Sequence, residues 1–192
     1  PPNITYRGVD LTGSKIKSIS SGTGGCKRIA VFSGSGRIGI SCDGNQSSSD
    51  NYMVQAFPKN AWGKKYLTCR TGGNMTNNIY RVCVADPATV VTVNGLPIGT
   101  PLINNFYYEI AATATLQRIE SDLPILVAQY ITSQNECGNG NPGDPEVIYL
   151  SPVEQNISNV TWNATGNFNI NQHYFNVVIP NTGTAISSFT LN

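Results

Sequence analysis

Short runs of β-branched and aromatic residues recur along the chain, each bounded by Gly, Pro, Asn or Ser. Apolar runs of four to eight residues between such turn residues are typical of β-strands. Residues 111–118 come closest to a helical pattern, but they include two threonines and no capping residue. The sequence therefore predicts an all-β fold, with strands that include residues 82–84, 90–93, 125–131, 147–150 and 174–179.

Two turn signals suggest how these strands are connected. Asn94 and Gly95 follow an apolar run, and both tolerate the positive φ that a type I′ hairpin turn requires. Residues 33–36, Ser-Gly-Ser-Gly, are predicted to turn residues 29–32 back onto 37–40. Short strands with frequent turns favour an antiparallel β-sandwich-type module over the alternatives, a propeller or a solenoid.

The chain also matches itself once, at an offset of about 95 residues. The matches keep their order, so we expect two tandem β repeats, residues 1–97 and 98–192, in a chain that is part of a longer parent protein. Val31 with Val127, and Val82 with Val177, are then expected on core-facing strands. The matched pairs are residues 28–32 with 124–128, Cys42 with Cys137, 53–58 with 147–152, 80–84 with 175–179, and 91–94 with 189–192.

Composition narrows the functional class. Of the 192 residues, 40% are hydrophobic, but only 12% are charged, about half the usual share. Asn, Ser, Thr and Gly must therefore cover the surface, which is typical of secreted and cell-surface proteins. The net charge of +1 gives no electrostatic footprint for nucleic acid or an acidic membrane. No apolar run reaches the roughly 18 residues that would span a bilayer, so no membrane insertion is expected.

The five cysteines allow two disulfides in an oxidising compartment. If residues 33–36 form a hairpin turn, Cys26 and Cys42 face each other at its open end. Cys69 and Cys83 flank a polar loop and are expected to pair across neighbouring strands, which leaves Cys137 unpaired. The alternative is that these residues are buried free thiols, a common state for cysteine.

No catalytic or cofactor site is recognisable. The only histidine, His173, lies in a strand-like run, and no zinc-ligand spacing exists. Asp43 and Asp50 could ligate calcium through oxygen atoms, as could Asp144 and Glu146 more weakly, but polar turns are the favoured interpretation. We therefore expect no enzyme, no metal and no cofactor.

Two further features concern the surface. Aromatic residues at 62, 66, 106–108 and 162 could stack on sugars, although aromatic residues in strands are more often part of the core. Glycan-acceptor triplets mark exposed loops only if the source glycosylates asparagine. These triplets begin at Asn3, Asn45, Asn74, Asn156, Asn159 and Asn163.

Several phrases together resemble the IgGFc-binding protein N-terminal domain family, over nearly the whole chain and in the expected order. The resemblance implies a secreted, β-rich region of a large multidomain protein, and the Asn- and Thr-rich style is most similar to bacterial members, many from Bacteroidetes. The family has no catalytic motif to transfer. The phrases are residues 29–34, 55–58, 62–66, 79–82, 92–95, 125–130, 144–145 and 150–155, the last including Pro-Val-Glu-Gln.

The sequence thus predicts a non-catalytic structural and adhesive module of an extracellular or cell-surface protein. It is expected to act through repeated weak contacts with neighbouring copies or domains of the same surface protein, and with glycans. The main alternative is a specific receptor domain for a glycan or protein ligand, including an immunoglobulin-like one. An accessory domain of a secreted hydrolase is the third hypothesis.

Overall fold

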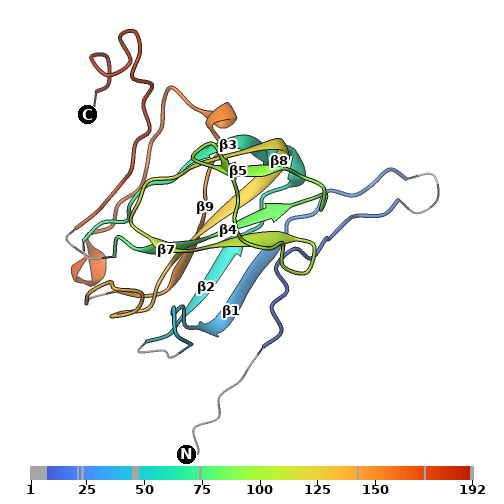
Figure 1. The fold of residues 1–192 in the computed structure, drawn as a ribbon, viewed down its shortest axis with the longest axis horizontal. Coiled ribbons are helices and arrows are strands. Elements are labelled where there is room, and N and C mark those ends of the chain that lie inside the picture. The colour runs from blue at the N-terminus through green and yellow to red at the C-terminus, as the bar shows by residue number, and fades with distance from the viewer. Residues whose placement is uncertain are drawn as a thin grey trace, which may run out of the picture.

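The computed structural model describes residues 8–20, 22, 24–44, 48–73, 75–141, 143–170 and 172–190. These residues form antiparallel strands and three short 3₁₀ helices (Figure 1). The all-β, sandwich-type prediction is confirmed. In chain order the elements are β1 (Phe32–Ile38), β2 (Asp50–Gln55), η1 (Lys59–Ala61), β3 (Gly63–Leu67), β4 (Asn78–Val84), β5 (Val91–Val93), β6 (Leu96–Pro97), β7 (Tyr107–Thr113), β8 (Arg118–Ile131), β9 (Glu146–Tyr149), η2 (Val153–Gln155) and η3 (Asn167–Asn169).

Strand β8 organises the larger, seven-stranded sheet. It is 14 residues long, and its two halves have different partners. The first half pairs with β3 on one side and β5 on the other. The second half pairs with β4 and β9, and β7 adds to the outer edge of β4. The exchange of partners along one strand makes the sheet curl strongly, while β1 and β2 form a separate two-stranded sheet.

The core lies inside this curl. Strand β4 alternates buried and half-buried residues, as a strand with one core-facing side must. Its inward residues, Tyr80, Val82 and Val84, meet Ile125 and Val127 of β8. Tyr66 is fully buried, and its hydroxyl donates to the carbonyl oxygen of Ile125 at 2.6 Å and accepts the N–H of Gly63 at 3.1 Å.

The two predicted turns have opposite outcomes. Asn94 and Gly95 have φ values of 53° and 84° and join β5 to β6, so that hairpin is confirmed. The turn predicted at residues 33–36 is wrong, because these residues lie inside β1, where Ser33, Gly34 and Ser35 pair with β2. Gly34 is required there for close approach, since a Cβ would collide with the Tyr52 carbonyl oxygen.

The predicted strand at residues 174–179 is absent from the structure, which assigns no strand to the described residues after β9. The expectation of a core-facing Val177 was therefore wrong, as this side chain is 47% exposed, whereas Val82 and Val127 are fully buried. Strands from both sides of residue 97 share one sheet. The division into two repeats remains a prediction about the sequence.

Candidate functional site

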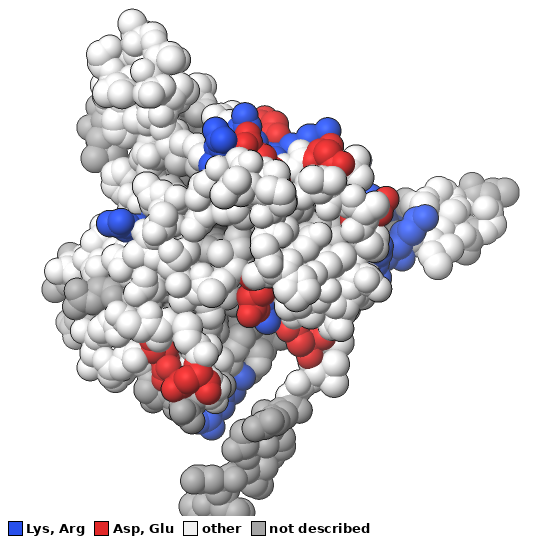
Figure 2. Space-filling view, in the orientation of Figure 1, with Lys and Arg blue, Asp and Glu red and all other residues white. Residues whose placement is uncertain are grey.

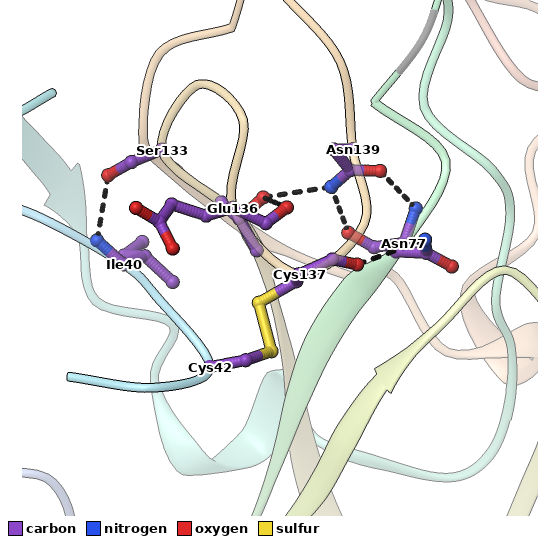
Figure 3. The surroundings of a disulfide bond; sticks show 8 residues. Ile40, Cys42, Asn77, Ser133, Glu136, Cys137 and Asn139 are labelled. Carbon is purple, nitrogen blue, oxygen red and sulfur yellow. Dashed lines mark hydrogen bonds between the residues drawn. A yellow bond between two sulfur atoms is a disulfide. The ribbon is translucent and has the colours of Figure 1, made fainter. Parts of the chain in front are cut away.

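Three loops meet at one end of the strands and form the candidate binding surface. They connect β1 to β2, β3 to β4 and β8 to β9. Their described parts, residues 39–44 with 48–49, 68–73 with 75–77, and 132–141 with 143–145, are called the loop cluster from here on. Loops held on a rigid scaffold are the usual place for binding residues. Figure 3 shows how these loops are joined.

A disulfide between Cys42 and Cys137 staples the first loop to the third (Figure 3). The predicted Cys26–Cys42 pair is thus wrong, because β1 runs straight through the residues that were expected to turn. The sequence did contain a signal for the observed pair, since Cys42 and Cys137 occupy matched positions in the self-alignment. Disulfides are typical of oxidising compartments, so this bridge fits an extracellular protein.

Cys69 and Cys83 are free thiols, so their predicted pairing is also wrong. The side chain of Tyr80, which interacts with Cys69, faces inward from β4. Cys83 lies three positions further along the same strand, where an odd step directs the side chain to the opposite face. Burial raises the pKa of both thiols, that of Cys83 to about 11, which keeps them protonated at neutral pH.

Thiol reactivity should follow this arrangement. With a limiting alkylating reagent at neutral pH, we expect the exposed Cys26 to react first, Cys69 and Cys83 to react slowly, and Cys42 and Cys137 to react only after reduction. Peptide mass mapping of the native protein measures this order. Rapid labelling of Cys137 without reductant would contradict it.

Amide side chains connect the second loop to the third. The backbone N–H of Asn77 donates to Oδ1 of Asn139 at 2.9 Å, and Nδ2 of Asn139 donates back to the Asn77 carbonyl oxygen at 2.7 Å. Nδ2 of Asn139 also donates to the Thr132 hydroxyl, and Nδ2 of Asn77 donates to the Cys137 carbonyl oxygen (Figure 3). These reciprocal bonds fix the position of the stapled loop relative to β4.

Hydroxyl groups complete the link to β1. The backbone N–H of Ile40 donates to the Ser133 hydroxyl at 3.0 Å, and that hydroxyl donates to the Ser48 carbonyl oxygen at 2.9 Å. Within the described residues, no buried side-chain nitrogen or oxygen lacks a hydrogen-bond partner. These hydrogen bonds between the loops come from neutral groups, and the exposed parts of the loop cluster can offer amide and hydroxyl contacts to a ligand.

A charged cluster that the sequence did not reveal lies on the outer face of β4. Arg81 contacts Asp10 at 2.8 Å and Glu109 at 2.9 Å. Its guanidinium lies over the rings of Tyr107 and Tyr130, at 4.7 and 5.1 Å from their centres. Asp10 comes from the first described segment, so Arg81 holds that segment against the sheet. The long sequence separation between these residues left no local signal.

The contact between Asp10 and Arg81 should depend on pH. Burial alone would raise the pKa of Asp10, but hydrogen bonds from Thr12 and the charge of Arg81 outweigh burial and hold this pKa below its usual value. A carboxyl group whose pKa is lower in the folded than in the unfolded protein stabilises the fold. This stabilisation is complete above the unfolded pKa, near 3.8, and is lost as the pH falls through the folded pKa. Asp10 is 45% exposed, which limits the effect through solvent screening.

We therefore expect Asp10→Asn to lower the free energy of unfolding by less than about 1 kcal/mol at pH 7, and by less at about pH 2.5 than at pH 7. Urea unfolding of both proteins at the two pH values measures the difference. Asp144→Asn, an exposed carboxyl on the β8–β9 loop, is the matched control. A difference that grows as the pH falls would contradict the assignment.

The other candidates considered from sequence were possible metal ligands and the histidine. Among the described residues, no group of three or more His, Cys, Asp or Glu side chains lies close enough to hold a metal ion. His173 is exposed, and a carboxylate oxygen of Glu146 accepts the backbone N–H of Val147. None of the helices in the described ranges has the length and apolar character needed to span a membrane.

The aromatic and glycan-acceptor candidates are divided between core and surface. Tyr66 and Tyr107 are buried, while Trp162 is 49% exposed and stacks against Phe175 at 5.1 Å. Asn156, Asn159 and Asn163 are all exposed. Asn3, Asn45 and Asn74 lie outside the described residues. Figure 2 shows wide uncharged areas, with charges of both signs gathered in small patches.

The family assignment agrees with the resemblance found from sequence. Searches of curated proteins and of solved structures give no significant match. The family model described as IgGFc binding protein matches residues 4–192, which is nearly the whole chain. The matched range includes all strands of the structure and both cysteines of the staple. The chain therefore belongs to the IgGFc binding protein family.

Proposed function

We propose that this chain is a non-catalytic structural and adhesive module of a large extracellular or cell-surface protein. The family is one of extracellular, non-enzymatic binding domains, so a binding role is the starting point. The finer proposal is that binding occurs through many weak contacts with proteins, with glycans and with further copies of the module. A bacterial source is part of this proposal, and the Asn- and Thr-rich surface supports it.

The observation that carries the proposal is the loop cluster. A disulfide and reciprocal amide bonds hold its loops together. Rigid loops lose little conformational entropy on binding. Neutral hydrogen bonds each contribute only about 0.5–1.5 kcal/mol net, so a single module gains little from any one contact. Strength must then come from repetition.

A specific receptor is the second candidate, and one hollow favours it. The hollow has a volume of about 410 Å³, which is within the range of small-ligand sites. Leu67, Cys69 and Leu116 line one side, and residues 177–179 line the other. A ligand that contacts both sides would be bound by apolar groups as well as by hydrogen bonds.

Titration of the isolated module separates these two functions. About four net hydrogen bonds of roughly 1 kcal/mol each correspond to a Kd of about 1 mM. We therefore expect no saturable binding to immunoglobulin Fc or to host-surface glycans at module concentrations of up to about 100 μM. Saturable binding below about 10 μM that Leu116→Ala removes would overturn the adhesive proposal and support the receptor. Leu123→Ala, an exposed leucine outside the hollow, is the control.

A further inference from the structure

Strand β1 has an open edge. It pairs with β2 alone, and no other described strand lies along its second side. The carbonyl oxygen of Val31 accepts the N–H of Ala56, so alternate residues from Val31 onward direct their backbone groups to β2. The backbone groups of Phe32 and Gly34 therefore face the open edge. An edge of this kind is a template for another strand.

Strands β1 and β8 each pair with the strand that follows them in the chain, β2 and β9, and the two pairings have the same register. Four β1–β2 pairs, 32–55, 33–54, 34–53 and 35–52, correspond under the self-alignment to the β8–β9 pairs 128–149, 129–148, 130–147 and 131–146. The bond from the Ala56 N–H to the Val31 carbonyl oxygen recurs from Leu150 to Val127. A one-residue slip in either hairpin would break all four correspondences.

The correspondence continues past the hairpins. Pro58 precedes η1 and Pro152 precedes η2, with nearly equal backbone angles of −65° and 149° against −70° and 155°. Each proline carbonyl accepts the backbone N–H three residues later. β1, β2 and η1 thus have the same local structure as β8, β9 and η2. The two units differ in what occupies the second edge of the first strand.

In β8 that edge is occupied by β4, with Val82 opposite Val127. The sequence that matches residues 80–84 of β4 is residues 175–179. The same register applied to β1 places Val177 opposite Val31, Phe175 opposite Ser33, and Ile179 opposite Ile29. Residues 172–190 contain no Asp, Glu, Lys or Arg, so no charge of the kind that protects edges opposes this pairing.

Residues 175–179 do not occupy that edge within the molecule. Asn176 donates to the Arg70 carbonyl oxygen, and residues 177–179 lie beside Leu67, next to β3. Tyr174, Phe175 and Val178 are 44–64% exposed. In Figure 1 this arm extends on the side of β3, whereas β1 lies on the opposite side of the sheet. The donor segment and the acceptor edge of one molecule thus point apart, as in a head-to-tail contact between copies.

We propose that the open edge of β1 binds residues 175–179 of a second copy as an antiparallel strand, with Val177 opposite Val31. Main-chain hydrogen bonds supply the contact, and the alternating side chains fix the register. Because donor and acceptor are different surfaces, the contact repeats along an open line of molecules. This deepens the self-assembly part of the proposed function by naming the partner and both segments.

Cysteine crosslinking tests the register. Val31 and Val177 would form a pair without mutual hydrogen bonds, the closer kind, which is within reach of a disulfide. Val31→Cys and Val177→Cys are made separately in the full chain with Cys26→Ser, Cys69→Ser and Cys83→Ser, then mixed under mild oxidation. We expect Val31→Cys and Val177→Cys to give at least about ten times more crosslinked heterodimer than Val31→Cys mixed with Val178→Cys. The side chain at position 178 would face the other way.

The remaining outcomes decide against the proposal. If the mixture gives no heterodimer, β1 does not bind this segment of a second copy. If a chain with both Val31→Cys and Val177→Cys forms only an internal crosslink, the segment closes on its own molecule instead. Sedimentation provides an independent check, since Asn176→Pro should abolish concentration-dependent association by removing a ladder donor. The crosslink reports strand pairing alone, so its failure leaves ligand binding to be judged by titration.

Discussion

Replacing Cys137 with serine is expected to lower the free energy of unfolding by about 2–5 kcal/mol. The disulfide joins residues 95 positions apart, so it removes much of the freedom of the unfolded chain. In the folded state it connects the β1–β2 loop to the loop that follows β8 (Figure 3). Chemical denaturation of Cys137→Ser and of the unmodified chain, both without reductant, measures the loss.

Cys26→Ser is the matched control, because Cys26 is exposed and free. It should change the free energy of unfolding by less than about 0.5 kcal/mol. Cys42→Ser should reproduce the loss seen for Cys137→Ser, since each variant removes the same bond. Equal stability of all three variants would show that the staple does not contribute to the fold.

Truncating Ile125 to alanine is expected to lower the free energy of unfolding by about 2–5 kcal/mol. Ile125 is fully buried at the point where β8 changes partners, opposite Gly63 of β3 and Val84 of β4. Loss of its side chain leaves a cavity, and the strands cannot close this cavity without breaking the hydrogen bonds of β8 to β3 and β4. The free energy of unfolding from urea titration is the measurement.

Ile148→Ala is the control for this prediction. Ile148 lies on β9, also pairs with β8, and is 40% exposed. Its truncation removes a side chain of the same size from a position that is not part of the core. We expect it to lower the free energy of unfolding by less than about 1 kcal/mol. Similar losses at both positions would mean that the core is not centred on β8.

Much of the fold could be predicted from local patterns. Residues 82–84, 91–93, 125–131 and 147–149 form strands as their apolar runs indicated, and Asn94-Gly95 is a hairpin turn. The Ser-Gly-Ser-Gly run misled because glycine serves turns and close strand approach equally well. At Gly34 the close approach of β2 is the reason for glycine, and no local pattern shows the neighbouring strand.

The strand expected at residues 174–179 has the right pattern, but it has no partner strand among the residues that the structure describes. A strand is stable only when its backbone groups are paired, so local sequence is not enough. The same limit applies to the candidate site. Asp10 and Arg81, and Asn77 and Asn139, meet only after the sheet has formed. The pairing of Cys42 with Cys137 was open to prediction from their matched positions, but hairpin geometry pointed elsewhere.

Retention on the host's own surface material tests the central claim most directly. One module and a tandem array of the same module are compared at equal module concentration, with washing at fixed flow. The adhesive account predicts weak retention of the single module, and retention of the array about 10²-fold stronger or more, because linked modules raise the effective concentration. Tight retention of the single module, with no gain from the array, would contradict it.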